Sequence, residues 1–435
     1  MISSSMTLDV VAFALAIVTA SGFVAVPVAP RPTKCVRLSC NVHEESQTTS
    51  PILTAVEFYS GIGGLRVALE VAQDAAGSRN RKASGATVVE SYDINAVANL
   101  VYELNFPGKR VARRSIEHLS RKDLDGIADV WLLSPPCQPF CRVGKQMDTE
   151  DTRSVSFLHL LSILESVADP PLYFFLENVQ GFEGSRAHER LLQVLSTRGY
   201  DVEQYLLSPV QLGIPNTRLR YYCLATRHVD GEGHIAAVEE SMPSPAEAAA
   251  SAPDSGTRVP TKTLSEFLDA SLSGNAAISL ILSPKATGHA NSSLRFDLVT
   301  LRSTETTTFT KGYGKHAGRA GPVILLSADG TRKASEEDLG RFPEGIDLGA
   351  TGREVRWFSD REMLRLHGFP ETFAFPPDLT LRQRFSLIGN SVSVNVVAVL
   401  LRRLLFEGTK VEREVAAERV TNGCAPVLSS PQVGT

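Results

Sequence analysis

The sequence contains few cysteines, little net charge and no internal repeat. Six cysteines are scattered through 435 residues, which is no disulfide framework for a chain of this length and fits a reducing compartment. Cys137 and Cys141 lie close together, but no second Cys or His cluster at ligand spacing accompanies them, so we predict no metal site. A formal net charge of -4 gives no global sign of nucleic-acid binding, so any such surface must be a local basic patch.

The composition is that of a soluble globular protein. Hydrophobic residues make up 43% of the chain and charged residues 21%. A chain of 435 residues can bury a sizeable core and predicts two domains, at roughly 100–200 residues per domain.

The first 50 residues differ from the rest of the chain. No charge occurs from Val10 to Pro30, and the apolar run Val10–Val18 is followed by small residues, as in a secretory signal. A basic, acid-free stretch then runs from Phe23 to Val42, so the whole resembles a bipartite plastid-targeting leader. Asp9 and the lack of early Lys or Arg argue against targeting, and an untargeted tail stays open. Prolines weaken a membrane span, and we expect no membrane association of the mature protein.

Strand-like and helix-like segments alternate after residue 52. Short apolar runs typical of buried strands cover 54–59, 86–93, 128–134 and 171–179. Helical periodicity follows them at 64–72, 95–106 and 154–168, and returns at 358–370 and 381–407. This alternation predicts an α/β fold with a parallel, doubly wound, Rossmann-like sheet. After Arg227 the pattern breaks, and an Ala/Pro-rich stretch near 236–262 predicts a surface loop.

A glycine turn joins the first predicted strand to the first predicted helix. The turn Tyr59–Gly64 lets a ligand approach the backbone, and the following helix offers unpaired N–H groups. A plain glycine-rich turn is the alternative, and the spacing is not that of a dinucleotide site. Asp93 ends the second strand, where a carboxylate can accept hydrogen bonds from ribose hydroxyls or cap the next helix.

A cysteine flanked by prolines follows the third predicted strand. Pro135, Pro136 and Pro139 restrict the backbone around Cys137 and fix the direction of its thiol. Ligands bind at this edge of an open α/β sheet, which favours a nucleophile over a buried core thiol.

A carboxyl group and two arginines can join this thiol. Glu177 ends the next apolar run, and Arg218 and Arg220 fall on one face if 218–225 form a strand. A helix cap or surface carboxylate for Glu177, and a solvated face for the arginines, remain the alternatives.

In this order, the segments resemble the motifs of the cytosine-C5 methyltransferase family. "EFYSGIGGL" resembles its cofactor turn, "SPPCQPF" its nucleophile loop, "LENV" its base-binding strand, "RLRYY" its arginine strand and "LIGNSVSVNVV" its closing helix. The resemblance covers about 53–227 and 356–406. It divides the chain into a leader (1–50), a catalytic core (51–227), an insertion loop with a target-recognition region (228–354), closing helices (355–408) and a C-terminal tail (409–435).

The resemblance implies S-adenosylmethionine as cofactor and a covalent mechanism. The thiolate of Cys137 would add to C6 of cytosine and activate C5, Glu177 would bind the base, and Arg218 and Arg220 would orient the base and the thiol. The residues carried over to the cofactor site are Ile62, Gly63, Gly64, Asp93, Ile116, Glu117, Ser134, Ser156, Asn390 and Ser391. Those carried over to the substrate site are Phe309, Thr310 and Lys311.

Several segments favour the branch of the family that methylates tRNA. "SPPCQPFCRVGKQMD", "LGIPNTRLRYYCLA", "FTKGYGKH" and "HGFPETFAFP" resemble that branch, which implies an anticodon-loop cytosine, with tRNA-Asp as the expected substrate. Thr308 stands where the branch usually has cysteine, which puts fine substrate recognition in doubt. Basic residues outnumber acidic ones around this region and could bind phosphates or form an ordinary solvated surface: Arg295, Arg302, Lys311, Lys315, His316 and Arg319 against Asp297 and Glu305.

Two other functions stay open at this point: a DNA cytosine-5 methyltransferase, and a nucleic-acid-binding protein without activity. An inactive binder has no physical need for an activated thiol. We expect a monomer, located in the cytoplasm or nucleus by the family resemblance, or in a plastid or other organelle if the leader is used.

Overall fold

The computed structural model describes eleven stretches of the chain. They are 52–79, 85–109, 111–136, 155–228, 233–243, 260–269, 271–272, 274–282, 297–315, 320–326 and 355–407. The predicted leader, Cys137, Cys141 and the predicted C-terminal tail after 407 lie outside these stretches.

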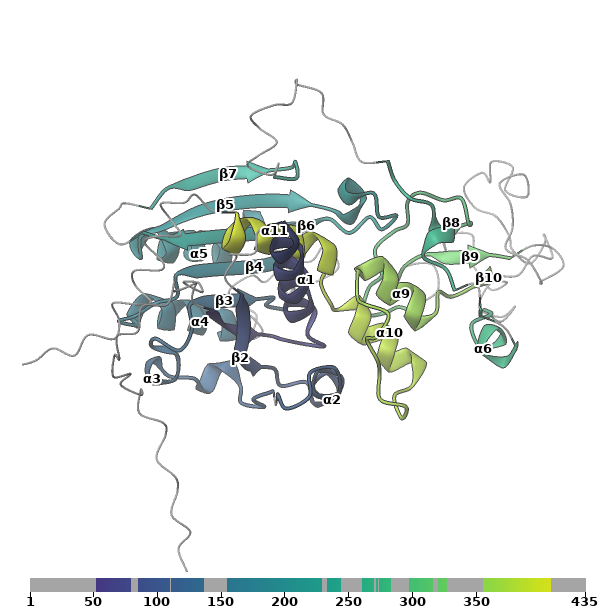
Figure 1. The fold of residues 1–435 in the computed structure, drawn as a ribbon, viewed down its shortest axis with the longest axis horizontal. Coiled ribbons are helices and arrows are strands. Elements are labelled where there is room, and N and C mark those ends of the chain that lie inside the picture. Colours follow the sequence, from purple (N-terminus) through teal and green to yellow (C-terminus); the bar gives the residue numbers. More distant parts are fainter. Residues whose placement is uncertain are drawn as a thin grey trace, which may run out of the picture. The chain divides into compact units, whose positions relative to one another are not determined.

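A seven-stranded sheet forms the centre of the fold (Figure 1). In order across the sheet its strands are β2 (Ala86–Tyr92), β1 (Leu53–Phe58), β3 (Val130–Leu133), β4 (Tyr173–Val179), β6 (Arg220–Arg227), β5 (Tyr200–Leu207) and β7 (Ile235–Glu239). The pairs β1–β2, β1–β3 and β3–β4 are parallel, as the sequence predicts. The α/β fold is therefore confirmed.

Alternating side chains of the strands build two cores, one on each face of the sheet. Leu132 and Phe175 point into one core, which is shared with α1 (Gly64–Arg79), α2 (Ala96–Asn105) and α11 (Val394–Phe406). Their neighbours Trp131 and Phe174 point into the other core, shared with α3 (Arg121–Leu124), α4 (Val155–Ser166) and α5 (Arg186–Thr197). Burial on both faces explains the continuous apolar runs of β3 and β4.

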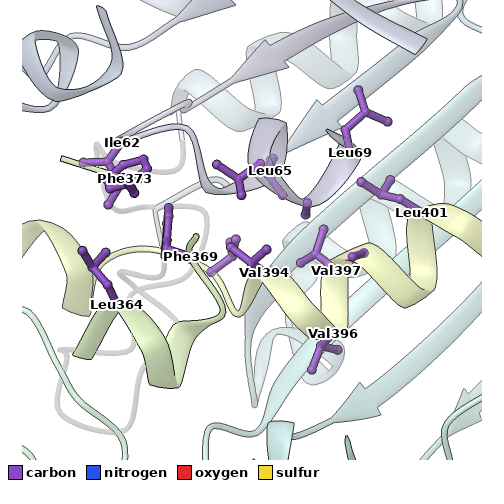
Figure 2. Close-up of a cluster of buried hydrophobic side chains, with 14 of the residues drawn as sticks. Ile62, Leu65, Leu69, Leu364, Phe369, Phe373, Val394, Val396, Val397 and Leu401 are labelled. Atoms are coloured by element: carbon purple, nitrogen blue, oxygen red, sulfur yellow. The ribbon is translucent and has the colours of Figure 1, made fainter. Parts of the chain in front are cut away.

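The last helix packs against the first one. Figure 2 shows Leu65 and Leu69 of α1 facing Val394, Val397 and Leu401 of α11. Each such buried aliphatic side chain stabilises the fold by about 1.5–3 kcal/mol. The stretch Leu381–Phe406 is long and apolar enough to cross a membrane by composition, but 67% of its most apolar window is buried in the protein. Packing in the core accounts for that composition.

The region after β7 contains a second, smaller sheet. It consists of β8 (Leu298–Val299), β9 (Val323–Leu325) and β10 (Val355–Arg356), and α6 (Gly274–Ile278) and α9 (Asp360–His367) belong to the same part of the chain. Arg356 and Glu362 form a buried bidentate ion pair, in which Nη1 lies 2.8 Å from Oε2 and Nη2 lies 2.8 Å from Oε1. Because Glu362 also accepts hydrogen bonds from the N–H groups of Ser359 and Asp269, its charge is fully compensated away from water.

Four features differ from the sequence-based expectations. The strand β6 runs antiparallel to β4 and β5, so the sheet is mixed. The stretch expected to be a loop after Arg227 contains the edge strand β7, although 244–259 lie outside the described residues. The sequence reasoning did not identify α5 and β5. The long helical pattern at 381–407 is broken into α10 (Leu381–Gly389) and α11.

Glu57 is a carboxyl group in the core beneath the glycine turn. Its side chain is fully buried, and the Tyr102 hydroxyl donates to Oε2 at 3.0 Å. Burial raises its pKa from 4.5 to about 8, although the Tyr102 hydrogen bond acts in the opposite direction. The carboxyl group is therefore protonated at neutral pH.

We predict that Glu57 makes the fold less stable as the pH rises. Because its pKa is raised in the folded protein, its stabilising contribution is complete below the unfolded value and is lost as the pH rises toward about 8. Glu57→Gln, which resembles the protonated acid, should remove this dependence, an effect on the order of a few kcal/mol. Urea unfolding between pH 5 and 9 measures it, with Glu189→Gln on the exposed side of α5 as control. Parallel pH profiles for wild type and Glu57→Gln would contradict the prediction.

Candidate active site

A cavity of about 480 Å³ lies where the parallel strands of the large sheet end. The carboxyl ends of β1, β2, β3 and β4 meet at this edge, since these strands are parallel. The antiparallel β6 places its amino-terminal end at the same edge, because Arg220 pairs with Val179. Predicted site residues that line the cavity are Ile62, Gly64, Asp93, Ile116, Glu117, Ser134, Ser156, Glu177, Arg218, Arg220, Lys311, Asn390 and Ser391.

The glycine turn is held by unusual backbone conformations. Tyr59, Gly61 and Gly63 all have positive φ angles, of 57°, 51° and 89°. Gly63 does not line the cavity. A side chain there would meet the Phe106 ring, so glycine is needed at this position for packing against α2. The predicted role of Gly63 in the cofactor site stays a prediction.

Gly64 allows the start of α1 to touch the closing segment. A Cβ atom at Gly64 would lie 2.6 Å from Ser391 Oγ and 2.9 Å from Val392 Cγ2. Glycine is therefore needed here for close packing between two segments that are far apart in the sequence.

Asp93 ties the turn to the second strand. Its Oδ2 accepts from the Gly61 N–H at 2.8 Å and its Oδ1 from the Asn95 N–H at 2.7 Å. Burial raises its pKa, while these two hydrogen bonds lower it. Asn95, rather than Asp93, caps α2, since its side chain accepts from Val97 and Ala98. Of the two roles that the sequence left open, the structure places Asp93 on the cavity wall.

Tyr59 connects three walls of the cavity and was missed by the sequence reasoning. The Ser134 hydroxyl donates to the Tyr59 carbonyl at 3.1 Å, and the Tyr59 hydroxyl donates to Ser156 Oγ at 3.0 Å. A non-glycine residue with φ of 57° is uncommon and stores backbone strain, which is frequent at functional sites. Its position within the glycine turn is the sequence feature that could have indicated its place in the cavity wall.

Part of the cavity wall is apolar, with a carboxylate next to it in the sequence. Ile116 is buried in a short 3₁₀ helix, and the next residue, Glu117, is exposed. Ile94 also lines the cavity, and 73% of its surface is exposed. The sequence reasoning missed Ile94, although its position directly after Asp93 could have indicated it. Apolar side chains with a few polar groups are typical of a cofactor pocket.

Glu177 faces Arg220 on the wall of the cavity. Arg220 Nε lies 3.5 Å from Glu177 Oε1, and both side chains are largely buried. Burial raises the pKa of Glu177, and the charges of Arg220 and Arg218 lower it. The predicted convergence of a carboxyl group with the two arginines is present.

Arg218 has a different environment from Arg220. It is 3% exposed, and its guanidinium donates to the backbone carbonyls of Phe309, Gly389 and Ser391.

The remaining residues of the predicted site differ in their placement. Some line the cavity, one lies outside the described residues, and others do not line the cavity. Pro135 and Pro136 line the cavity, but Cys137 lies outside the described residues. Lys311 lines the cavity, whereas Thr310 does not. Phe309 is fully buried among Tyr313, Phe358 and His367, so its side chain cannot contact a substrate in this arrangement.

The described residues contain part of the predicted basic patch. Within the described ranges, no three His, Cys, Asp or Glu side chains gather as a metal site would require. Lys311 and Lys315 are exposed, as is Arg302. Arg295, His316 and Arg319 of the predicted basic patch lie outside the described residues.

The sequence matches the family model "C-5 cytosine-specific DNA methylase" over residues 53–405. The chain belongs to the C-5 cytosine methyltransferase family. Its relatives include two proteins named "tRNA (cytosine(38)-C(5))-methyltransferase", from Mus musculus and Schizosaccharomyces pombe. Both are 34% identical, with 82% and 81% of this chain and 94% and 97% of the relatives covered. An equally identical relative from Dictyostelium discoideum, with 81% and 94% covered, is named "DNA (cytosine-5)-methyltransferase".

A solved structure agrees with this family. The Dnmt2 methyltransferase of S. pombe has a TM-score of 0.63 and 32% identity, covering 81% of this chain and 98% of that one. Members of this family generally use S-adenosylmethionine.

Proposed function

We propose that this protein transfers a methyl group from S-adenosylmethionine to C5 of a cytosine in the anticodon loop of tRNA, with tRNA-Asp as substrate. The observation that carries the proposal is the single cavity that joins the glycine turn and Asp93 to Glu177 and Arg220. The first pair suits a nucleoside cofactor and the second a pyrimidine base, so the two reactants would lie side by side.

The cavity fits S-adenosylmethionine, which supplies an electrophilic methyl group when bound. Asp93 and Glu117 offer carboxylate oxygens to ribose hydroxyls, while Ile116 and Ile94 offer apolar surface to adenine. Ser60 also lines the cavity, and its buried hydroxyl has no hydrogen-bond partner among the described residues. A buried hydroxyl of this kind favours a polar ligand.

Cys137 would activate the base by forming a covalent bond. Its thiolate adds to C6 of cytosine, and the electron pair of the C5–C6 double bond makes C5 nucleophilic. C5 would then take the methyl group as the methyl–sulfonium bond breaks and S-adenosylhomocysteine is released. The C5 proton would leave to solvent or a base, the C5–C6 double bond would form again and the C6–sulfur bond would break. Pro135 and Pro136 on the cavity wall support this role, since they lead the chain directly into Cys137.

Glu177 matches the polar edge of cytosine in its protonated form. N3 of cytosine accepts a hydrogen bond and the exocyclic amine donates one. A protonated carboxyl group provides one donor and one acceptor, and burial of Glu177 raises its pKa toward that form. Arg220 would stabilise negative charge that develops on the ring when the thiolate adds.

Several relatives named for tRNA support RNA over DNA. A cytosine in a single-stranded loop can turn into a pocket at lower cost than a paired base, which must first be unstacked. DNA is the second candidate because of the Dictyostelium relative.

The first prediction from the proposed function concerns the substrate. The protein without residues 1–50 should transfer tritiated methyl groups to total tRNA, and Cys137→Ala should abolish the transfer because no thiolate can add to C6. Scintillation counting, with tRNA and genomic DNA assayed in parallel, measures the methyl groups transferred to each nucleic acid. Label in DNA alone would show that the protein methylates DNA instead of tRNA. Binding without turnover would indicate a nucleic-acid-binding protein without activity. Full activity of Cys137→Ala would refute the covalent mechanism.

The second prediction concerns Glu177. Glu177→Gln should lower kcat about 10²–10⁴-fold, since the amide cannot supply a transferable proton to N3. Single-turnover kinetics on the tRNA that accepts label separate this step from product release. Glu189→Gln on α5 is the matched control, because this side chain is exposed. A wild-type kcat for Glu177→Gln would remove Glu177 from the mechanism.

The third prediction concerns the contact between the glycine turn and the closing segment. Gly64→Ala should weaken S-adenosylhomocysteine binding at least about tenfold, because its Cβ would push Ser391 and Val392 away. Gly184→Ala is the matched control, since no atom lies within 4 Å of a Cβ at that site. Calorimetric titration gives both dissociation constants, and equal values would show that the contact does not shape the pocket.

A further inference from the structure

Arg218 joins two segments that are distant in the sequence. Its Nη1 donates to the Phe309 carbonyl at 3.1 Å, and its Nη2 donates to the carbonyls of Gly389 at 3.3 Å and Ser391 at 2.5 Å. All three acceptors are neutral backbone groups. A guanidinium with donors in a fixed planar fork can serve several such acceptors at once, which a lysine ammonium cannot reproduce.

The segment that contains Phe309 is attached to the chain just before Arg218. The Thr217 N–H donates to the Thr306 carbonyl at 2.9 Å, and the Thr308 hydroxyl donates to the Thr217 carbonyl at 2.6 Å. The Thr306 hydroxyl donates to the Pro215 carbonyl at 2.9 Å. Thr308, the departure from the family pattern, therefore makes a specific hydrogen bond next to Arg218.

The segment that contains Ser391 touches the same region from the other side. A Cβ atom at Gly389 would overlap the Thr310 carbonyl and would lie 2.9 Å from the Lys311 nitrogen. The backbone of Thr310 and Lys311 thus rests directly on Gly389. Lys311 and Ser391 both line the cavity. The two segments that contain them meet where Arg218 lies.

We propose that Arg218 is a positioning residue, which holds the recognition segment Thr306–Lys311 and the cofactor segment Gly389–Ser391 against the strand that carries Arg220. Arg220 differs, because its guanidinium lies beside Glu177. Arg218 acts through backbone carbonyls on the walls of the cavity, so its loss opens the binding sites for cofactor and RNA. This inference rests on the proposed function.

The test compares Arg218→Lys with Arg220→Lys. We expect Arg218→Lys to raise the dissociation constant of S-adenosylhomocysteine and the KM for tRNA at least tenfold each. Arg220→Lys should lower kcat by a larger factor than it raises either constant. Calorimetry with S-adenosylhomocysteine and steady-state methylation of tRNA give these values, and thermal unfolding checks that each variant is folded. A fall of kcat in Arg218→Lys with both binding constants unchanged would overturn the inference.

The calorimetric arm also separates this inference from the proposed function. A wild-type protein that does not bind S-adenosylhomocysteine would overturn the proposed function and the inference with it. A wild-type protein that binds it as tightly as Arg218→Lys does would overturn the inference alone.

Thr308 provides a test that does not remove a buried charge. Thr308→Val should raise the KM for tRNA several-fold at unchanged kcat, because the hydrogen bond to Thr217 is lost. Thr308→Ser keeps the hydroxyl and should restore the wild-type KM, and Thr87→Val, at an exposed position of β2 outside the recognition segment, is the matched control. If Thr308→Val keeps the wild-type KM as Thr87→Val does, the attachment of the recognition segment has no role in binding. If Arg218→Lys does not fold, this test still decides whether the attachment of the recognition segment contributes to tRNA binding.

Discussion

The site depends on the reversed direction of one strand. β6 lies between β4 and β5 and runs antiparallel to both. A parallel β6 would place its amino-terminal end at the opposite edge of the sheet, away from Glu177. Because it is reversed, Arg220 pairs with Val179 and lies beside the carboxyl end of β4. The short connection from β5 to β6 contains no crossover helix, which is the connection that antiparallel strands allow.

A second constraint is the break between the last two long helices. The closing pattern at 381–407 has one continuous apolar period, yet the chain leaves the helix after Gly389 and re-enters it at Val394. Asn390 and Ser391 lie at this break and reach the cavity. Since α11 is held against α1 by buried aliphatic contacts, the break is fixed beside the glycine turn (Figure 2). Helix packing far from the chemistry therefore sets a wall of the cavity.

Buried polar groups of this protein are compensated in different ways. Glu57 keeps its proton, Arg356 and Glu362 neutralise each other, and Arg218 donates to three backbone carbonyl oxygens. Glu177 is intermediate, since burial raises its pKa while two arginines lower it. An unpaired charge is costly in the interior, so only such arrangements are tolerated there. The intermediate state of Glu177 suits a group that exchanges a hydrogen bond with a substrate.

The sequence by itself determined the alternation of strands and helices, the glycine turn, and 13 of the 29 residues that line the cavity. These follow from local signals: apolar periodicity, glycine and proline positions, and short motifs in a fixed order. Only the tertiary structure decided that β6 is reversed, that Phe309 is buried, and that Arg218 binds Phe309, Gly389 and Ser391. These outcomes depend on contacts between segments far apart in the chain, which no local pattern of residues encodes.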